Sequence, residues 1–307
     1  SRSGALSDII DAGARILESA CGPCIGMGQS PNSKGVSLRT FNRNFLGRSG
    51  TKDAGIYLVS PETAAASAIT GVLTDPRTLG EMPQFDIPDK FIINDNMVTL
   101  PAGDNEYESV EVLRGPNIKD YPKTSPLSDS LSVECSLKTG DNITTDHIMP
   151  AGAKILPLRS NIPEISKHCF EVVDTEFPER ALSLGESVIV GGSNYGQGSS
   201  REHAAICPMY LGVKALIAMA IERIHAANLV NFGIVPFTFA DKADYDKIEQ
   251  GDSLVIEGLR DKLAKKEMPI TAVLTKKDGS KAEIKLNYHL SDEDIKIILA
   301  GGRLNVK

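Results

Sequence analysis

The residues best suited to chemistry lie in one short stretch, Gly191–Ala205, with the sequence GGSNYGQGSSREHAA. The apolar run Glu186–Val190 before it predicts a buried strand, and the periodicity after it predicts a helix. Glycines between a strand and a helix let the backbone approach a ligand closely, and the helix N-terminus offers unpaired N–H groups. The guanidinium of Arg201 adds a second point of contact for a carboxylate or phosphate. The stretch therefore predicts an anion-binding turn that also holds the hydroxyls of Ser199 and Ser200.

A helix cap is the simpler interpretation of the same residues. Ser199 would then cap the helix, and Glu202, three residues later, would complete a capping box. Capping boxes are common, and the spacing alone is compatible with one. A cap does not explain why Gly196, Gly198 and Arg201 crowd the same turn, and this crowding favours the anion site.

A second motif, Cys21-Gly22-Pro23-Cys24, places two thiols at CxxC spacing. A thioredoxin-like redox pair, half of a zinc site and two thiolate ligands of an iron–sulfur cluster all use this spacing. The redox motif starts a helix after a strand, whereas here an amphipathic helix, predicted over Leu6–Ser19, precedes it. The chain also has no Trp, which usually accompanies the redox motif, and no second CxxC or CxxH pair for zinc follows. Taken by itself, the motif leaves all three sites open.

Two further groups of polar residues could contact a ligand. Ser37–Arg48 carries three arginines around two asparagines and a glycine, and Arg43 and Arg48, five residues apart, would converge only from a loop. A solvated basic turn is the alternative. Asp146 and His147 are adjacent in a polar turn, where an acid and an imidazole can do acid–base work if one is oriented. The alternative is that Asp146 caps a helix; the next arginine, Arg159, follows on another loop.

The elements that must position these residues fall into three regions. Residues 1–75 contain a predicted strand, Gly55–Ser60, and a helix, Pro61–Thr70, which Ser60 caps and Gly71 ends. A single strand–helix unit cannot bury both faces of a sheet, so this region predicts part of a larger α/β domain. Residues 76–130 hold seven of the 17 prolines and predict a connector between domains.

Residues 131–307 predict a mixed β/α domain in which strands and helices alternate. A last helix, with Ser291 and Asp294 as a capping box, ends near Gly301. His168, His225 and His289 have no partners in sequence and are interpreted as structural or surface residues. The predicted strands are Leu131–Leu137, Glu186–Val190, Lys214–Ala220, Ile234–Phe239, Ser253–Ile256, Ile270–Thr275 and Ala282–Tyr288, and a helix is predicted over Ile221–Phe232.

Composition restricts the class of protein. The 307 residues suffice for two domains, and a net charge of −7 without a basic run does not favour nucleic-acid binding. No apolar run is long enough to span a membrane, and the first residues have no signal-peptide core. Five cysteines, an odd number in a long chain, argue against a disulfide framework. We expect a reducing compartment, either the cytoplasm or, in a eukaryote, the mitochondrial matrix.

Five motifs, in this order along the chain, resemble the C-terminal half of the aconitase family. They are ACGPCIGMGQS, FNRNFLGR, LVSPETAAASAITG, NITTDHIMPAGA and GGSNYGQGSSREHAA. They match the end of its third domain, its linker and its fourth, swivelling domain. The resemblance implies an aconitate hydratase-type hydro-lyase, which isomerises citrate to isocitrate through cis-aconitate at a [4Fe–4S] cluster.

The resemblance also implies a partly incomplete cluster site. Cys21 and Cys24 would be two of the three protein ligands, and Asn42 would lie beside the cluster. In the family the third cysteine comes from more N-terminal domains. None of the other cysteines has ligand spacing, and we interpret them as core thiols: Cys135, Cys169 and Cys207. We therefore expect the chain alone to be inactive, with N-terminal aconitase domains, in the same full-length chain or a separate subunit, as its partner.

The implied catalytic groups are Ser199, the general base acting as an alkoxide, and Asp146, an active-site acid with His147 next to it. An alkoxide is costly in water, so N–H donors and cations must surround it. Several arginines would hold a tricarboxylate so that its proton faces the base. The implied substrate contacts are Arg43, Arg48, Arg159, Ser200 and Arg201.

Other assignments remain open. 3-Isopropylmalate dehydratase and homoaconitase share the GSSREH turn but commonly carry the swivelling domain as a separate subunit without this linker. Continuity from CGPC to GSSREH favours aconitase, and Arg159 suits a third carboxylate better than an isopropyl group. A thiol–disulfide oxidoreductase that uses CGPC is the alternative from a different class. The acidic net charge gives no support to the RNA-binding role known in the wider family.

Overall fold

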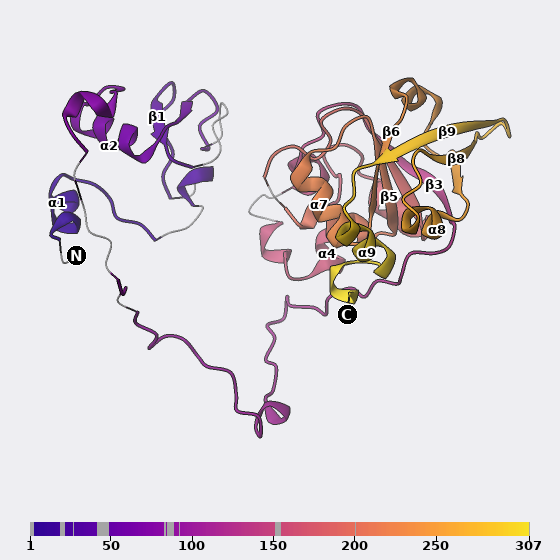
Figure 1. The fold of residues 1–307 in the computed structure, drawn as a ribbon, viewed down its shortest axis with the longest axis horizontal. Helices are drawn as coiled ribbons and strands as arrows, with labels where there is room; N and C mark the ends of the chain where they lie inside the picture. Colours follow the sequence, from indigo (N-terminus) through magenta and orange to yellow (C-terminus); the bar gives the residue numbers. More distant parts are fainter. Residues whose placement is uncertain are drawn as a thin grey trace. The chain divides into compact units, whose positions relative to one another are not determined.

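A computed structural model describes residues 3–18, 22–26, 28–41, 49–82, 84, 89–91, 93–150, 155–199 and 201–306. The chain divides into two compact units, Ser1–Leu100 and Pro101–Lys307, each with its own internal packing (Figure 1). The division falls inside the proline-rich connector, and the boundaries at residues 75 and 130 stay a prediction. In the described ranges, no helix is both long and apolar enough to cross a bilayer.

The first unit is built around a small parallel sheet. Strands β1 (Val36–Arg39) and β2 (Gly55–Leu58) pair in parallel, with Val36 opposite Gly55. Helix α2 (Pro61–Thr70) follows β2 directly. The remaining elements are α1 (Ala5–Asp11) and the short 3₁₀ helices η1 (Pro23–Ile25) and η2 (Pro76–Leu79).

One predicted helix of this unit is confirmed and the other is too long. The hydroxyl oxygen of Ser60 accepts a bond from the Thr63 N–H at 3.1 Å, and Gly71 ends α2 with φ +79°. The amphipathic helix predicted over Leu6–Ser19 stops at Asp11, because Gly13 adopts φ +84°. No residue of α1 is buried, so none of its apolar side chains lies in a hydrophobic core of the described residues.

The second unit is a closed seven-stranded barrel. Its strand order is β3-β4-β5-β6-β9-β8-β7, and β7 returns to β3. Strands β3 to β6 are parallel, whereas the remaining pairs are antiparallel. The strands are β3 (Leu131–Lys138), β4 (Ser187–Gly191), β5 (Val213–Ala218), β6 (Val235–Phe239), β7 (Ser253–Ile256), β8 (Ile270–Thr275) and β9 (Lys281–Tyr288).

Helices lie outside this barrel, as Figure 1 shows for α4, α7 and α9. All seven strands predicted for the second unit are present within two residues of their predicted ends, which confirms the α/β fold class. The helix predicted over Ile221–Phe232 is shorter, and the Ser291–Asp294 capping box is confirmed. The helices are α3 (Thr145–Ile148), α4 (Ile162–Ile165), α5 (Phe177–Leu184), α6 (His203–Tyr210), α7 (Arg223–Asn231), α8 (Leu259–Ala264) and α9 (Asp292–Ala300), with 3₁₀ turns η3 (Tyr107–Ser109), η4 (Leu156–Leu158), η5 (Ser166–His168), η6 (Lys242–Lys247) and η7 (Arg303–Asn305).

Strand β4 separates two hydrophobic cores. Val188 and Val190 point into the barrel, and Ile189 points outward into a second core formed with the helices α4 to α6. This follows from strand geometry, since successive side chains lie on opposite faces. Every residue of β4 is buried, which is typical of a parallel strand covered on both sides. The strand that leads into the glycine-rich turn is therefore fixed on both faces.

Three cysteines lie in these cores, as the sequence predicted. Cys135 faces the barrel interior, and Cys169 and Cys207 belong to the second core. Burial raises the pKa of the Cys135 and Cys207 thiols to about 12, and it also raises the pKa of the Cys169 thiol well above its ordinary value. Since a metal ligand must be a thiolate, these groups are poor ligands.

A buried carboxylate fixes the turn before β7. Asp252 accepts bonds from the Glu249 N–H at 2.8 Å, the Lys277 N–H at 3.3 Å and the Lys276 ammonium at 3.0 Å. Burial acts to raise the pKa of the Asp252 carboxyl, but the bonds from Glu249 and Lys276 outweigh it. The net result is a pKa below the ordinary value of 3.8.

We predict that Asp252→Asn lowers the free energy of unfolding by about 1.5–3 kcal/mol near neutral pH, because it removes hydrogen bonds to a charged group. A lowered pKa in the folded state gives stability that is complete above the unfolded pKa and is lost as the pH falls through the folded pKa. The difference between wild type and variant should therefore shrink below about pH 3.8. Hydrogen exchange of the β7 and β8 amides in urea measures this difference in the free energy of unfolding. The exposed Asp246→Asn is the control. A difference that does not change with pH would show that the ionised Asp252 carboxylate is not the stabilising group.

Candidate functional site

Two turns leave neighbouring parallel strands at the same edge of the barrel. Strand β3 leads into the turn that carries Asp146, and β4 leads into the turn that carries Ser199. Main-chain bonds continue the pairing of the two strands beyond their ends, so the turns lie side by side. The carboxyl edge of parallel strands is the usual place for a binding site in such sheets. The bonds are Gly192 N–H to Gly140 O (3.1 Å), Asn142 N–H to Ser193 O (2.8 Å), Gly196 N–H to Ile143 O (2.7 Å) and Thr145 N–H to Gln197 O (2.9 Å).

Glycine is required at two points of this turn because other groups lie against the backbone. A Cβ on Gly196 would lie 2.3 Å from ring carbons of His225, and the residue has φ +83°. A Cβ on Gly192 would lie 2.1 Å from Oδ1 of Asp141. The same Oδ1 accepts a bond from the Ser193 N–H at 2.6 Å. The glycines therefore serve close packing of the turn onto its neighbours.

The helix after the turn starts later than the sequence predicted. Helix α6 begins at His203 with Glu202 in the N-cap position and has no side-chain cap, so Ser199 and Glu202 do not form the capping box. Arg201 precedes the helix instead of lying in its first turn, and its position is set by side-chain contacts. Ser199 is half-buried on the turn, and Ser200 lies outside the described residues.

The guanidinium of Arg201 is held by the neighbouring turn. Its Nη1 donates to the carboxylate of Asp146, in an ion pair, and to the Met149 carbonyl at 3.3 Å. The Arg201 side chain is 23% exposed and that of Asp146 is 61% exposed, so the pair contributes orientation more than stability. Within the described part of the chain, both contacts use Nη1 alone. In a guanidinium, the Nε and Nη2 edge can donate two parallel hydrogen bonds to a carboxylate.

Asp146 and His147 are adjacent in sequence but serve different partners. Thr144 caps α3: its hydroxyl oxygen accepts a bond from the His147 N–H at 3.2 Å, and His147 Nδ1 accepts one from the Thr144 N–H at 3.1 Å. The residue in the cap position is therefore Thr144, and the alternative that Asp146 is the cap is wrong. The bond to Nδ1 requires the neutral imidazole to carry its proton on Nε2.

The loop of Arg159 joins the same region through the main chain. His203 Nε2 donates to the Arg159 carbonyl at 2.8 Å, which places this loop at the start of α6, two residues from Arg201. The Arg159 side chain is exposed. The structure thus brings together the segments that carry Asp146, Arg159, Ser199 and Arg201.

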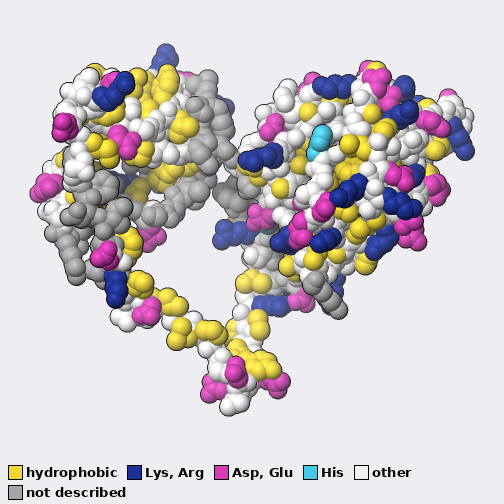
Figure 2. Space-filling model, in the orientation of Figure 1, with side chains coloured by type: hydrophobic (Ala, Val, Ile, Leu, Met, Phe, Trp, Pro, Cys, Tyr) yellow, Lys and Arg dark blue, Asp and Glu magenta, His cyan; other side chains and the backbone are white. Residues whose placement is uncertain are grey.

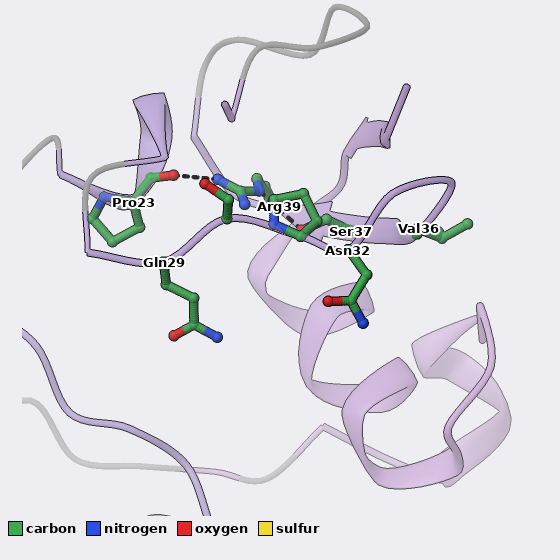
Figure 3. Close-up of a pocket in the computed structure, with 9 residues that line it drawn as sticks. Pro23, Gln29, Asn32, Val36, Ser37 and Arg39 are labelled. Atoms are coloured by element: carbon green, nitrogen blue, oxygen red, sulfur yellow. Dashed lines mark hydrogen bonds between the residues drawn. The ribbon is translucent and has the colours of Figure 1, made fainter. Parts of the chain in front are cut away.

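In the first unit, the turn that carries Cys24 is fixed from two sides. Arg39 donates to the Pro23 carbonyl at 2.5 Å and to the Ser37 hydroxyl at 2.9 Å, as Figure 3 shows beside a small polar pocket. The buried Ser49 hydroxyl donates to the Cys24 carbonyl at 3.3 Å. The described part of the CGPC motif is therefore a 3₁₀ turn, not the start of a longer helix that a thioredoxin-like pair requires.

The donor chemistry at this turn fits an iron–sulfur cluster as far as it is described. Cys24 is a soft sulfur donor on a backbone that side chains hold in place. The other predicted residues of this region, Cys21, Asn42, Arg43 and Arg48, lie outside the described residues. Across the ranges the structure describes, no three His, Cys, Asp or Glu residues are grouped to hold a metal ion.

Several residues that shape the site were not predicted to do so. Asp141 and Thr144 fix the turns, and His203 anchors the Arg159 loop. Asp141 lay in the polar stretch already noted, and His203 in the glycine-rich one. Nothing in the sequence marks His225, because its contact with Gly196 joins residues on different elements.

Comparison with known proteins gives matches along the chain. The model of the aconitase family (aconitate hydratase) matches residues 1–71, and that of the aconitase C-terminal domain matches residues 139–242. The probable mitochondrial aconitate hydratase of Caenorhabditis elegans is 32% identical over 350 residues, which cover 99% of this chain and 44% of that protein. The mitochondrial homoaconitase of Candida albicans is 35% identical, over 78% of this chain and 34% of its own length.

A solved structure of 3-isopropylmalate dehydratase from Methanocaldococcus jannaschii is 30% identical, with a TM-score of 0.46. The match covers 58% of this chain and 92% of that one. This chain spans less than half the length of the mitochondrial relatives named above.

We predict that Gly196→Ala destabilises the second unit more than Gly279→Ala. Gly279 has φ +84°, almost the value at Gly196, but a Cβ there would meet nothing within 4 Å. Gly279→Ala should therefore cost only the left-handed backbone, about 1–2 kcal/mol. Gly196→Ala should add about 1–3 kcal/mol for overpacking against His225. Thermal and urea unfolding measure both variants, and equal losses would show that the ring does not press on the turn.

Proposed function

The chain belongs to the aconitase family, and from this premise we propose that it supplies the C-terminal half of the active site of a hydro-lyase. The reaction is the isomerisation of citrate to isocitrate through cis-aconitate. One observation carries the proposal: Asp146 holds the guanidinium of Arg201 beside the turn of Ser199, with an edge open to a carboxylate. A carboxylate grip next to a hydroxyl is what proton abstraction from a polycarboxylate requires.

In this function Arg201 binds a substrate carboxylate through Nε and Nη2, while Asp146 keeps it in place. Arg159, whose loop is anchored by His203, reaches a further carboxylate from its exposed position. The family motifs assign the remaining carboxylate contacts to Arg43, Arg48 and Ser200. Bidentate contacts of this kind fix orientation as well as position.

Ser199 acts as the general base. Its alkoxide form is costly in water, and the nearby Arg201 cation and the main-chain N–H groups of the glycine-rich turn lower that cost. His147 stays a candidate for proton transfer, because the bond to Nδ1 leaves Nε2–H to face a partner. Asp146 serves as the carboxylate that orients Arg201.

The cofactor of this function is a [4Fe–4S] cluster held by Cys21 and Cys24, with Asn42 beside it. When bound, the cluster supplies Lewis acidity at an iron that has no protein ligand. Arg39 and Ser49 hold the turn that presents Cys24. The third ligand belongs to the partner domains, since Cys135, Cys169 and Cys207 are buried with raised pKa values.

The partner is the N-terminal part of an aconitase, in the same full-length chain or as a separate subunit. The surface of the first unit supports this, since hydrophobic side chains gather on it (Figure 2). A two-stranded sheet with one helix leaves apolar faces without cover among the described residues, and N-terminal domains would bury them. The exposed apolar residues include Leu6, Ile9, Ile10, Ile69, Val72, Leu73, Leu79 and Met82.

Homoaconitase and 3-isopropylmalate dehydratase activities are the alternatives within the family. The linker that joins the two units in one chain favours aconitase, and Arg159 offers a cation for a third carboxylate. The relatives named as mitochondrial favour the mitochondrial matrix over the cytoplasm if the source is a eukaryote. Activity of the completed enzyme on isopropylmalate alone would overturn the choice of substrate.

We predict that anaerobic reconstitution loads about four iron and four sulfide per chain only when N-terminal aconitase domains are supplied. Cys24→Ser should abolish loading, because it removes a thiolate ligand. Cys207→Ala, which changes a core thiol, should leave loading intact. Iron and sulfide analysis measures all three samples. A stable cluster on this chain alone would mean that one of its buried cysteines is a ligand.

In the completed enzyme, Ser199→Ala should lower kcat for citrate by about 10²–10⁴-fold with little change in KM, the effect of removing a general base. Ser193→Ala is the matched control, since its hydroxyl lies on the same turn but contacts the sulfur of Met219. Steady-state kinetics gives kcat and KM for citrate in both variants. Equal losses in both variants would assign the effect to distortion of the turn.

A further inference from the structure

A buried histidine lies beneath the glycine-rich turn. His225, in the first turn of α7, is 2% exposed, and ring carbons Cγ and Cδ2 face the backbone of Gly196. Its ring centroid lies 5.6 Å from that of Tyr195. The start of α7 is tied to the same turn, because Tyr195 N–H donates to the Ala220 carbonyl at 3.0 Å and Glu222 N–H to the Tyr195 carbonyl at 2.9 Å. The imidazole therefore packs directly against the backbone of the turn.

The ring nitrogens of His225 contribute no hydrogen bond to the described part of the chain. Neither Nδ1 nor Nε2 of His225 has a hydrogen-bond partner among the described residues. Burial lowers the pKa of His225 to about 4, so near neutral pH the ring is uncharged, with one N–H donor and one acceptor. A buried polar group without a partner destabilises a protein, whereas an apolar ring of similar shape would not. A histidine here costs stability that packing alone does not require.

The Cγ–Cδ2 edge of the ring faces the turn. A Cβ at Gly196 would be 2.3 Å from both Cγ and Cδ2. Nδ1 is bonded to Cγ and Nε2 to Cδ2, so both nitrogens border this edge. A small shift of the turn or one water molecule would connect either nitrogen to a main-chain group.

We propose that His225 is a positioning residue, which hydrogen-bonds the main chain of the glycine-rich turn through one ring nitrogen and so fixes Ser199 and Arg201 for reaction. The inference rests on the proposed function, because it concerns the same turn. It explains why this position holds a polar ring, although packing against the turn requires only a flat ring of this size.

The test compares three variants in the enzyme completed with N-terminal aconitase domains. His225→Phe should keep or raise the melting temperature yet lower kcat for citrate by between about tenfold and a hundredfold, as expected when a reacting group is misplaced. The amides of His225→Gln and His225→Asn can replace Nε2 and Nδ1 respectively, and at least one of these two variants should recover kcat. The exposed His289→Phe is the control and should change neither quantity. Full kcat in His225→Phe, or no recovery by either amide variant, overturns the proposal.

Hydrogen exchange on the full chain alone keeps this test separate from the proposed function. If wild type completed in this way fails to convert citrate, the proposed function fails and the inference is judged on exchange. His225→Phe should then raise exchange of the amides of residues 196–199 by up to about tenfold, the size of one lost hydrogen bond, with β4 and β5 unchanged. Unchanged exchange in the turn overturns the inference. If His225→Phe does not fold, His225→Leu, which also lacks a hydrogen-bonding group, takes its place in both measurements.

Discussion

The parallel pairing of β3 and β4 is the constraint on which the candidate site depends. Their side chains fill two cores, so neither strand can shift without disturbing packing on both faces. Because main-chain bonds continue from the strands into the turns, this rigidity reaches Asp146 and Ser199. The register of two buried strands thus determines which polar side chains meet at the edge of the barrel.

The ion pair between Arg201 and Asp146 is an example of two polar side chains that the register of these strands brings together. The two residues are 55 positions apart; Asp146 lies in the short helix α3, and Arg201 lies on the turn before α6. The pair is too exposed to contribute much stability. The pair restricts the long side chain of Arg201 to one conformation out of many. Less conformational entropy is therefore lost when a ligand binds to it.

Much of the second unit could be predicted from its sequence because its signals are local. Runs of β-branched residues marked the strands, and Ser291 with Asp294 marked the last helix. The start of α6 was not predicted: Glu202 had the spacing of a capping box with Ser199, but it lies in the N-cap position without a side-chain cap bond. Arg201, before the helix, pairs with Asp146, 55 residues earlier, and such a contact leaves no local signal. The closure of the barrel and the contact of His225 with Gly196 likewise arise from tertiary packing.

Closure of the barrel also bears on how the chain behaves when it is concentrated. A sheet closed on itself has no edge strand to which another molecule could add. Among the described residues, the open edges belong to β1 and β2, whose sheet has only two strands and carries the exposed Val36, Tyr57 and Leu58. Self-association through added strands is therefore a liability of the first unit. Charged substitutions there, away from the barrel, are where solubility of the chain can be improved.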